Sequence, residues 1–332
     1  MDEREMTMRE ALNLALDQAL AADERVFLLG EDIADPGASG PTAGLSTKYG
    51  HDRVLDTPIS EAAILGAAVG AAIDGLLPVA EIMIMDFIGI AADQLINNAA
   101  KLRFMTAGRT TAPITVRTQV YGGLATGATH SQTLEAWFMH IPGMKVIVPS
   151  TPRDGKGLLT SAIFDEDPCL FVETIRLQGQ KGLVPTEPGF SIPLGQADIK
   201  RPGSDVTIIS YGRSVLDSLA AAKALDEDGI SAEVVDLRTL VPLDIETMVE
   251  SVRRTRRAVV VHDAVQFAGP GAEIVATLQS ECFNELAAPI ERVAARFVPT
   301  PAAAALEAQL YPSPARIVAA VQRTRETAGA RG

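Results

Sequence analysis

The chain has 332 residues, of which 47% are hydrophobic, so it is long and apolar enough for two globular domains. Its formal net charge of −13 argues against a protein that binds nucleic acid. The two cysteines, Cys169 and Cys282, lie far apart, which argues against a disulfide scaffold or a cysteine-based zinc site and favours reduced thiols in the cytoplasm.

We expect neither a targeting signal nor a membrane anchor in the N-terminal segment. Met1 to Glu5 lack an apolar core and are too acidic for a transit peptide. No apolar run reaches the roughly 18 residues of a membrane span, since Asp86 and Gly89 interrupt the most apolar stretch. We therefore expect a cytoplasmic protein that does not associate with a membrane.

Short apolar segments alternate with helical segments over the first half of the chain. The predicted strands are 26–29, 53–56, 78–84, 114–117, 145–148 and 169–173, and the predicted helices are 7–22, 60–74, 88–105, 134–139 and 153–164. The strands are apolar runs without strict alternation, which is typical of a parallel sheet covered on both faces. Residues 33–47, rich in glycine, proline and serine, are expected to form a loop.

A segment rich in glycine and proline, residues 177–202, interrupts this alternation. We predict a first α/β domain over residues 1–180, a linker over 181–203 and a second, smaller α/β domain over 204–332. In the second domain the predicted strands are 206–209, 232–237, 258–262 and 290–294, and the predicted helices include 244–254, 272–283 and 314–325. Mostly parallel sheets are expected in both domains.

Several common site motifs are absent from the sequence. It contains no GxxxxGK[ST] loop and no GxGxxG after a strand, so neither a P-loop nor a dinucleotide fingerprint is indicated. The four histidines show no HExxH spacing, which argues against a catalytic metal held by this chain.

Glu61 is a candidate acid–base residue. It lies in the first turn of the helix predicted to begin at Ser60, a suitable N-cap, and apolar residues follow it. The helix dipole would stabilise its charge, whereas burial would raise its pKa, by up to roughly 3–5 units in extreme cases. From the residues alone, an ordinary first-turn glutamate fits as well.

His130 and Phe87 are two further candidates. His130 lies in the glycine-rich stretch 127–132 before a helix, where it would suit proton transfer near neutral pH or simply bond the loop. Phe87 follows a predicted strand, where an aromatic ring stacks on a planar ligand or packs in the core.

These segments together resemble the beta subunit of the thiamine-diphosphate-dependent decarboxylating component of 2-oxo acid dehydrogenase complexes. The resemblance is collinear from about Met8 to Val321. The matching motifs include Asp-Thr-Pro-Ile-Ser-Glu at 56–61, Gly-Ala-Ala-Val-Gly-Ala-Ala at 66–72, His-Ser-Gln at 130–132, Pro-Ser-Thr-Pro at 149–152, Asp-Leu-Arg-Thr-Leu at 236–240 and Gly-Ala-Glu-Ile at 271–274. It implies a transketolase-like pyrimidine-binding domain followed by a transketolase C-terminal-like domain.

The resemblance also implies roles for single residues. Glu61 would hydrogen-bond the pyrimidine ring nitrogen of thiamine diphosphate and so promote loss of the thiazolium proton, the cofactor acting as electron sink. His130 would lie near the substrate and the incoming lipoyl group. The other positions that match the cofactor pocket are Glu31, Ile59, Met83 and Phe87. Four positions, namely Ile114, Ala162, Asp165 and Asp167, match backbone-carbonyl ligands of a structural potassium ion.

One absence fits this resemblance. The chain contains no Gly-Asp-Gly, the motif with which thiamine enzymes hold the diphosphate through magnesium. We therefore expect an alpha subunit to supply Mg²⁺ and the diphosphate site in an alpha2beta2 heterotetramer, and a lipoyl-bearing acyltransferase core as a further partner.

Some residues depart from the family pattern, and alternatives follow. Thr129 replaces a usual Gln, Gln178 replaces a frequent Tyr, and residues 300–304 lack an aromatic residue. Met83 favours pyruvate or acetoin over branched-chain acids, whose enzymes often carry an amide there. The alternatives are an acetoin dehydrogenase beta subunit, a noncatalytic α/β partner and a homodimeric transketolase-type enzyme; the missing Gly-Asp-Gly disfavours the last.

Overall fold

The structure, a computed structural model, describes residues 2–34 and 40–329. The chain divides into two compact units, one made of Met1–Tyr121 and Trp137–Leu194 and the other of Gly122–Ala136 and Gly195–Gly332. The segment 122–136 therefore lies within the first half of the chain but belongs by its contacts to the second unit. The division at 194/195 falls inside the predicted linker, 181–203.

The first unit is built on a parallel sheet with the strand order β6-β7-β5-β4-β2-β3. Its strands are β2 (Val26–Gly30), β3 (Val54–Asp56), β4 (Leu77–Ile84), β5 (Thr115–Val120), β6 (Lys145–Ile147) and β7 (Cys169–Thr174). All six residues of β5 are buried, as expected for a strand inside a covered parallel sheet. The predicted parallel α/β architecture is confirmed.

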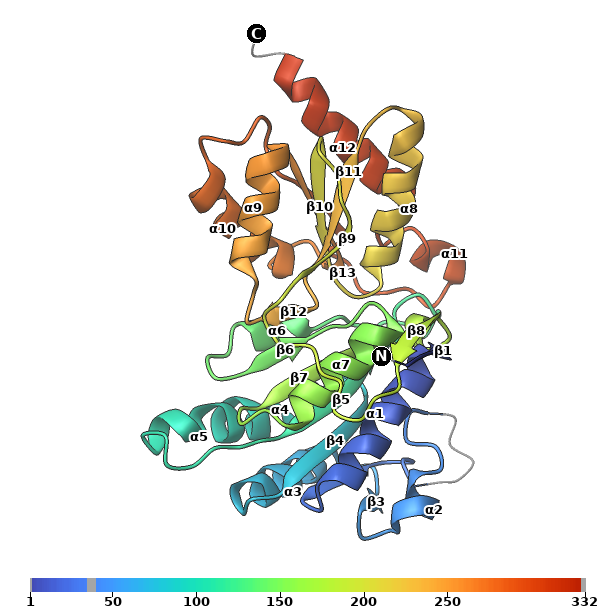
Figure 1. The fold of residues 1–332 in the computed structure, drawn as a ribbon, viewed down its shortest axis with the longest axis vertical. Helices are drawn as coiled ribbons and strands as arrows, with labels where there is room; N and C mark the ends of the chain where they lie inside the picture. The colour runs from blue at the N-terminus through green and yellow to red at the C-terminus, as the bar shows by residue number, and fades with distance from the viewer. Residues whose placement is uncertain (1, 35–39, 330–332) are drawn as a thin grey trace. The chain divides into compact units, whose positions relative to one another are not determined.

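Most helices of this unit lie close to their predicted positions, but the helix at residues 45–49 was not predicted and begins inside the stretch 33–47 that was predicted as a loop. They are α1 (Met8–Ala22), α2 (Leu45–Tyr49), α3 (Glu61–Ile73), α4 (Ile88–Asp93), a π-helical stretch (Gln94–Ala99), α5 (Ala100–Met105) and α7 (Pro152–Ile163). Helix α1 begins with a capping box between Thr7 and Glu10, which satisfies amides that have no partner inside the helix. Helix α1 packs on α7, and α3 packs on α4 (Figure 1).

The predicted linker, 181–203, contains two strands that the sequence analysis did not predict. Strand β8 (Lys181–Pro185) pairs antiparallel with β1 (Glu3–Thr7), and β9 (Asp198–Arg201) pairs antiparallel with β11. Each strand finds its partner far away in the sequence, where local glycine and proline content gives no signal. Strand β1 was not predicted for the same reason.

The second unit has its own sheet, in the order β14-β13-β10-β11-β9, parallel except for β9. Its elements are β10 (Val206–Ser210), α8 (Ser214–Glu227), β11 (Ala232–Asp236), β12 (Thr239–Val241), α9 (Ile245–Thr255), β13 (Ala258–Val265), α10 (Pro270–Cys282), β14 (Glu291–Ala295), α11 (Ala304–Glu307) and α12 (Pro314–Gly329). Helices α8 and α12 cover one face of this sheet, and α9 and α10 cover the other (Figure 1). The short elements β12 and α11 were not predicted.

Candidate active site

Three carboxylates gather where strands β2, β3 and β4 end. Glu31 follows β2, Glu61 is the first residue of α3, and Glu81 lies in β4 opposite Gly30. A Cβ atom on Gly30 would lie 2.9 Å from the Glu81 carbonyl oxygen, so only glycine permits this close approach. Parallel strands end at one sheet edge, which is the usual place for a ligand in α/β folds.

Backbone contacts hold the segment before Glu61 against β2. The Thr57 N–H donates to the Gly30 carbonyl at 2.9 Å, and the Ile33 N–H donates to the Asp56 carboxylate at 3.0 Å. The side chain of Ser60 does not cap α3, so the cap predicted from the sequence is wrong; its Oγ lies 3.4 Å from the Pro58 carbonyl instead. Glu61 itself is only 8% exposed.

The surroundings of Glu31 indicate a missing polar partner. Burial raises the pKa of Glu31, and neighbouring carboxylates, Glu61 first among them, act in the same direction. One carboxylate oxygen of Glu31, Oε2, is buried with no hydrogen-bond partner among the described residues. Because buried polar atoms are nearly always hydrogen-bonded in folded proteins, this oxygen fits a site for a polar ligand.

The apolar candidates lie along the same edge. Met83 and Phe87 are half-buried, in β4 and in the 3-10 turn Met85–Phe87 that follows it. Ile59, two residues before the buried Glu61, is 79% exposed. All five candidate cofactor positions, Glu31, Ile59, Glu61, Met83 and Phe87, lie in the first unit, after β2 or β3 or at the end of β4, and their contact with a cofactor stays a prediction.

A buried ion network joins three strands of the same sheet, and the sequence analysis did not find it. The Arg117 guanidinium in β5 donates to Glu173 in β7 at 2.7 Å and to Glu81 in β4 at 2.6 Å. Gln178, one of the departures from the family pattern, donates to the other Glu173 oxygen at 2.7 Å. Burial raises the pKa of Glu173, and the charge of Arg117 opposes that rise. Charged residues inside apolar strands were the available signal.

His130 belongs to the segment 122–136 and so to the second unit, unlike Glu61. Its ring is half-buried, and its Nδ1 lies 3.1 Å from the Thr129 hydroxyl. The Thr126 hydroxyl donates to the His130 carbonyl at 3.0 Å. Thr129, which replaces the usual Gln, is therefore in place to influence which ring nitrogen carries the proton.

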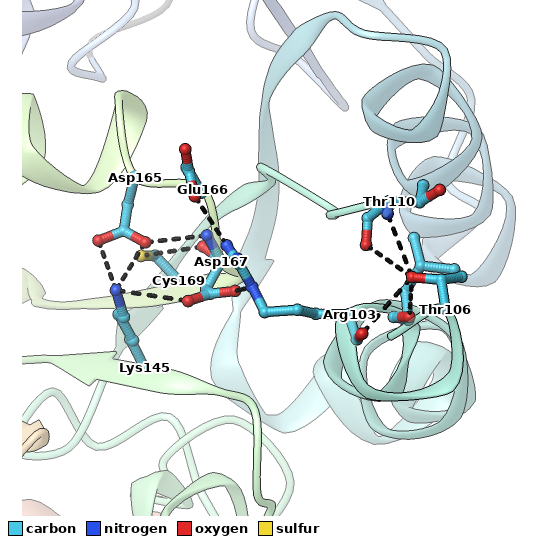
Figure 2. Close-up of polar contacts among 9 residues, drawn as sticks. Arg103, Thr106, Thr110, Lys145, Asp165, Glu166, Asp167 and Cys169 are labelled. Carbon is cyan, nitrogen blue, oxygen red and sulfur yellow. Dashed lines mark hydrogen bonds and ion pairs between the residues drawn. The ribbon is translucent and has the colours of Figure 1, made fainter. Parts of the chain in front are cut away.

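The four positions predicted to bind potassium converge on the turn before β7. The Ile114 carbonyl accepts the Cys169 N–H at 2.9 Å, and the Ala162 carbonyl accepts the Asp165 N–H at 3.3 Å. Two cations hold the side chains of this turn (Figure 2): Lys145 Nζ lies 2.6 Å from Asp165, and Arg103 Nε lies 2.6 Å from Asp167. The potassium ion itself stays a prediction.

Two negative findings apply to the described residues alone. No group of three or more histidine, cysteine, aspartate or glutamate side chains there could hold a metal ion. None of the helices over the described ranges is long and apolar enough to cross a membrane.

Comparison with known proteins identifies the family. The transketolase pyrimidine-binding domain matches residues 4–179, and the transketolase C-terminal domain matches residues 195–317. The beta subunit of acetoin:2,6-dichlorophenolindophenol oxidoreductase from Cupriavidus necator is 45% identical, over 97% of this chain and 98% of its own length. The chain belongs to the family of beta subunits of 2-oxo acid and acetoin dehydrogenases. The resemblance found in the sequence is confirmed.

Other relatives show how wide this family is. Subunit beta-2 of the mitochondrial pyruvate dehydrogenase E1 component from Oryza sativa is 46% identical, over 96% of this chain and 86% of its own length. The beta subunit of 2-oxoisovalerate dehydrogenase from Bacillus subtilis is 41% identical, over 97% and 99%. Each is a beta subunit and hence one part of a multi-subunit protein.

A solved structure confirms the two-domain transketolase-like fold of this beta subunit. A split-gene transketolase, described as an inactive beta4 tetramer, superposes with a TM-score of 0.77 at 24% identity. The superposition covers 96% of this chain and 98% of that one.

Proposed function

We propose that this chain is the pyrimidine-binding half of a thiamine-diphosphate-dependent 2-oxo acid dehydrogenase and is active only with an alpha subunit. The observation that carries the proposal is a pair of neighbouring carboxylates, the buried Glu61 and the half-buried Glu31, in a domain that matches a pyrimidine-binding family. The partnerless oxygen of Glu31 fits the ring's polar groups. The cofactor, when bound, supplies an electron sink for the departure of carbon dioxide.

Each side chain takes a separate task in this proposal. Glu61 holds a proton at the pyrimidine ring nitrogen, a task that suits a carboxyl group shielded from water. Met83, Phe87 and Ile59 provide apolar surface of the cofactor pocket. His130 holds or moves a proton near the substrate and the incoming lipoyl group.

The rest of the assembly follows from what this chain lacks. Without Gly-Asp-Gly it would rely on the alpha subunit, in an alpha2beta2 heterotetramer, to hold the diphosphate and Mg²⁺. The carbonyls of Ile114, Ala162, Asp165 and Asp167 would bind a structural potassium ion. A lipoyl-bearing acyltransferase core would receive the acyl group. The buried free thiols of Cys169 and Cys282 fit a cytoplasmic location.

Titration calorimetry tests whether cofactor binding depends on the alpha subunit. We expect the isolated chain to bind thiamine diphosphate weakly or not at all, and the mixture with the alpha subunit to bind it tightly and only with magnesium. Tight stoichiometric binding by the isolated chain would contradict the proposal.

The role of Glu61 is tested by Glu61→Gln in the reconstituted enzyme. The amide keeps the size but not the acid, so turnover with an artificial electron acceptor should fall on the order of 100-fold or more. Glu246→Gln is the matched control, because Glu246 also lies in the first turn of a helix, α9, but is exposed. Unchanged turnover in Glu61→Gln would refute the role.

Acetoin is a second candidate substrate because an acetoin-type relative is among the most similar proteins. Met83, at the half-buried end of β4, favours pyruvate or acetoin over branched-chain acids. One methylene is worth only about 1–3 kcal/mol of discrimination, and the alpha chain contributes to the pocket as well. Specificity constants for pyruvate, acetoin and 3-methyl-2-oxobutanoate, measured on the reconstituted enzyme, decide which of the three is the preferred substrate. A preference for the branched acid would overturn the assignment.

A further inference from the structure

A buried carboxylate in the second unit accepts two backbone hydrogen bonds from the segment that carries His130, and we call this pair of bonds the clasp. Glu307, the last residue of α11, is 2% exposed. Its two oxygens accept hydrogen bonds from the Gly123 N–H at 2.8 Å and the Ala125 N–H at 2.6 Å. Hydrogen bonds to a charged acceptor are about twice as strong as neutral ones. One side chain thus fixes two backbone positions of the segment.

The backbone of the clasped turn is shaped for this contact. Gly123 has φ of 92° and Ala125 has φ of 58°, both in the left-handed region. A left-handed conformation is strained for alanine and persists only where surrounding contacts compensate. The two bonds to Glu307 provide that compensation, because the amides of residues 123 and 125 donate to the two oxygens of one carboxylate.

The clasp connects to His130 through Thr126, the next residue along the chain. Its hydroxyl donates to the His130 carbonyl at 3.0 Å and lies 2.6 Å from the Ser131 hydroxyl. Beyond His130 a second tether fixes the segment, since the Tyr211 hydroxyl donates to Glu135 at 2.7 Å. His130 is therefore held between two anchors that both lie in the second unit.

We infer that Glu307 is a positioning residue for His130, and that the second domain serves to hold the loop bearing this histidine. The inference rests on the proposed role of His130. Glu307 acts by fixing the backbone from which the histidine extends and not by touching a reacting group. Displacement of a reacting group by about 1 Å is enough to slow a reaction on the order of 100-fold.

The test uses Glu307→Gln in the enzyme reconstituted with the alpha subunit. The amide offers one acceptor oxygen and places an NH₂ group against the second N–H, so one of the two bonds is lost. We expect acyl transfer to a lipoyl domain to fall about 10-fold, with decarboxylation to an artificial acceptor falling less. Glu307→Asp, which keeps both acceptors, should be intermediate. Glu250→Gln, exposed on α9, is the control and should leave both rates unchanged.

A double variant separates positioning from loss of structure. If Glu307 acts through His130, then Glu307→Gln combined with His130→Ala should transfer no more slowly than His130→Ala alone. Effects that simply add would overturn the inference. Hydrogen exchange at the amides of 123 and 125 should be faster in Glu307→Gln, while the strands of the second sheet keep their protection.

The same measurements distinguish failure of the inference from failure of the proposed function. If His130→Ala transfers acyl groups at the normal rate, the proposed role of His130 is wrong. Hydrogen exchange in Glu307→Gln then tests only whether Glu307 holds the loop. Faster exchange at the amides of 123 and 125 supports this role, and unchanged exchange overturns it.

Discussion

Two carboxylates, Glu173 in the first unit and Glu135 in the second, are equally buried but lie in contrasting surroundings. Glu173 accepts bonds from the Arg117 guanidinium and the Gln178 amide. Within the described part of the chain no cation pairs with Glu135, which accepts a bond from the Tyr211 hydroxyl. Burial raises the pKa of Glu135 to about 7, and that hydrogen bond opposes the rise. In the first case the charge of an arginine opposes the effect of burial on the pKa, and in the second case a phenol hydroxyl opposes it.

Removing Arg117 should have the largest effect, because it breaks the ion network around Glu173. Arg117→Met fills much of the same volume but leaves Glu173 and Glu81 without their cation. Breaking a buried ion pair by removing one partner typically costs about 3–5 kcal/mol of unfolding free energy. Urea unfolding of the variant should show this loss, and Arg9→Met, exposed on α1, should not. A stability within about 1 kcal/mol of the parent would mean that the network is not a stabilising feature.

The surroundings of Glu135 make the free energy of unfolding depend on pH. The folded protein favours the neutral form of Glu135, because its pKa is raised from 4.5 to about 7. Its contribution is therefore fully present below the unfolded pKa of 4.5 and is lost as the pH rises through about 7. The loss amounts to about 3 kcal/mol at most.

Two substitutions test whether this pH dependence comes from Glu135. Glu135→Gln keeps the acceptor for Tyr211 and cannot ionise, so unfolding free energies measured from pH 5 to pH 9 should decline less steeply than those of the parent. Tyr211→Phe removes a hydrogen bond that lowers the pKa of Glu135, so its decline should begin at the same pH but continue to higher pH. Parallel pH profiles for parent and Glu135→Gln would contradict the assignment of the titration to Glu135.

The smallest expected effect concerns Gln178. Gln178→Leu leaves one oxygen of the buried Glu173 without its donor while Arg117 remains in place. The loss of such a partner costs about 1–3 kcal/mol. Combining Gln178→Leu with Arg117→Met should be non-additive, because both act on the same carboxylate. Simple addition of the two losses in urea unfolding would show that they act independently.

The sequence predicted what local patterns encode. Apolar runs and helical periodicity located the strands of both parallel sheets, and the first-turn position of Glu61 followed from the run of residues after it. What was missed depends on pairing between distant residues: β8 on β1, Arg117 between two glutamates, and Glu307 on the amides of 123 and 125. No window of sequence contains both members of such a pair.

The path of the chain limits how this protein can be recombined. It passes from the first unit to the second at 121/122, returns at 136/137 and crosses again at 194/195. A chimera made by a single exchange at 194/195 would pair the 122–136 segment of one relative with the Glu307 and Tyr211 of another. Exchangeable modules in this family should therefore be cut in three places, with residues 122–136 inherited together with the C-terminal half.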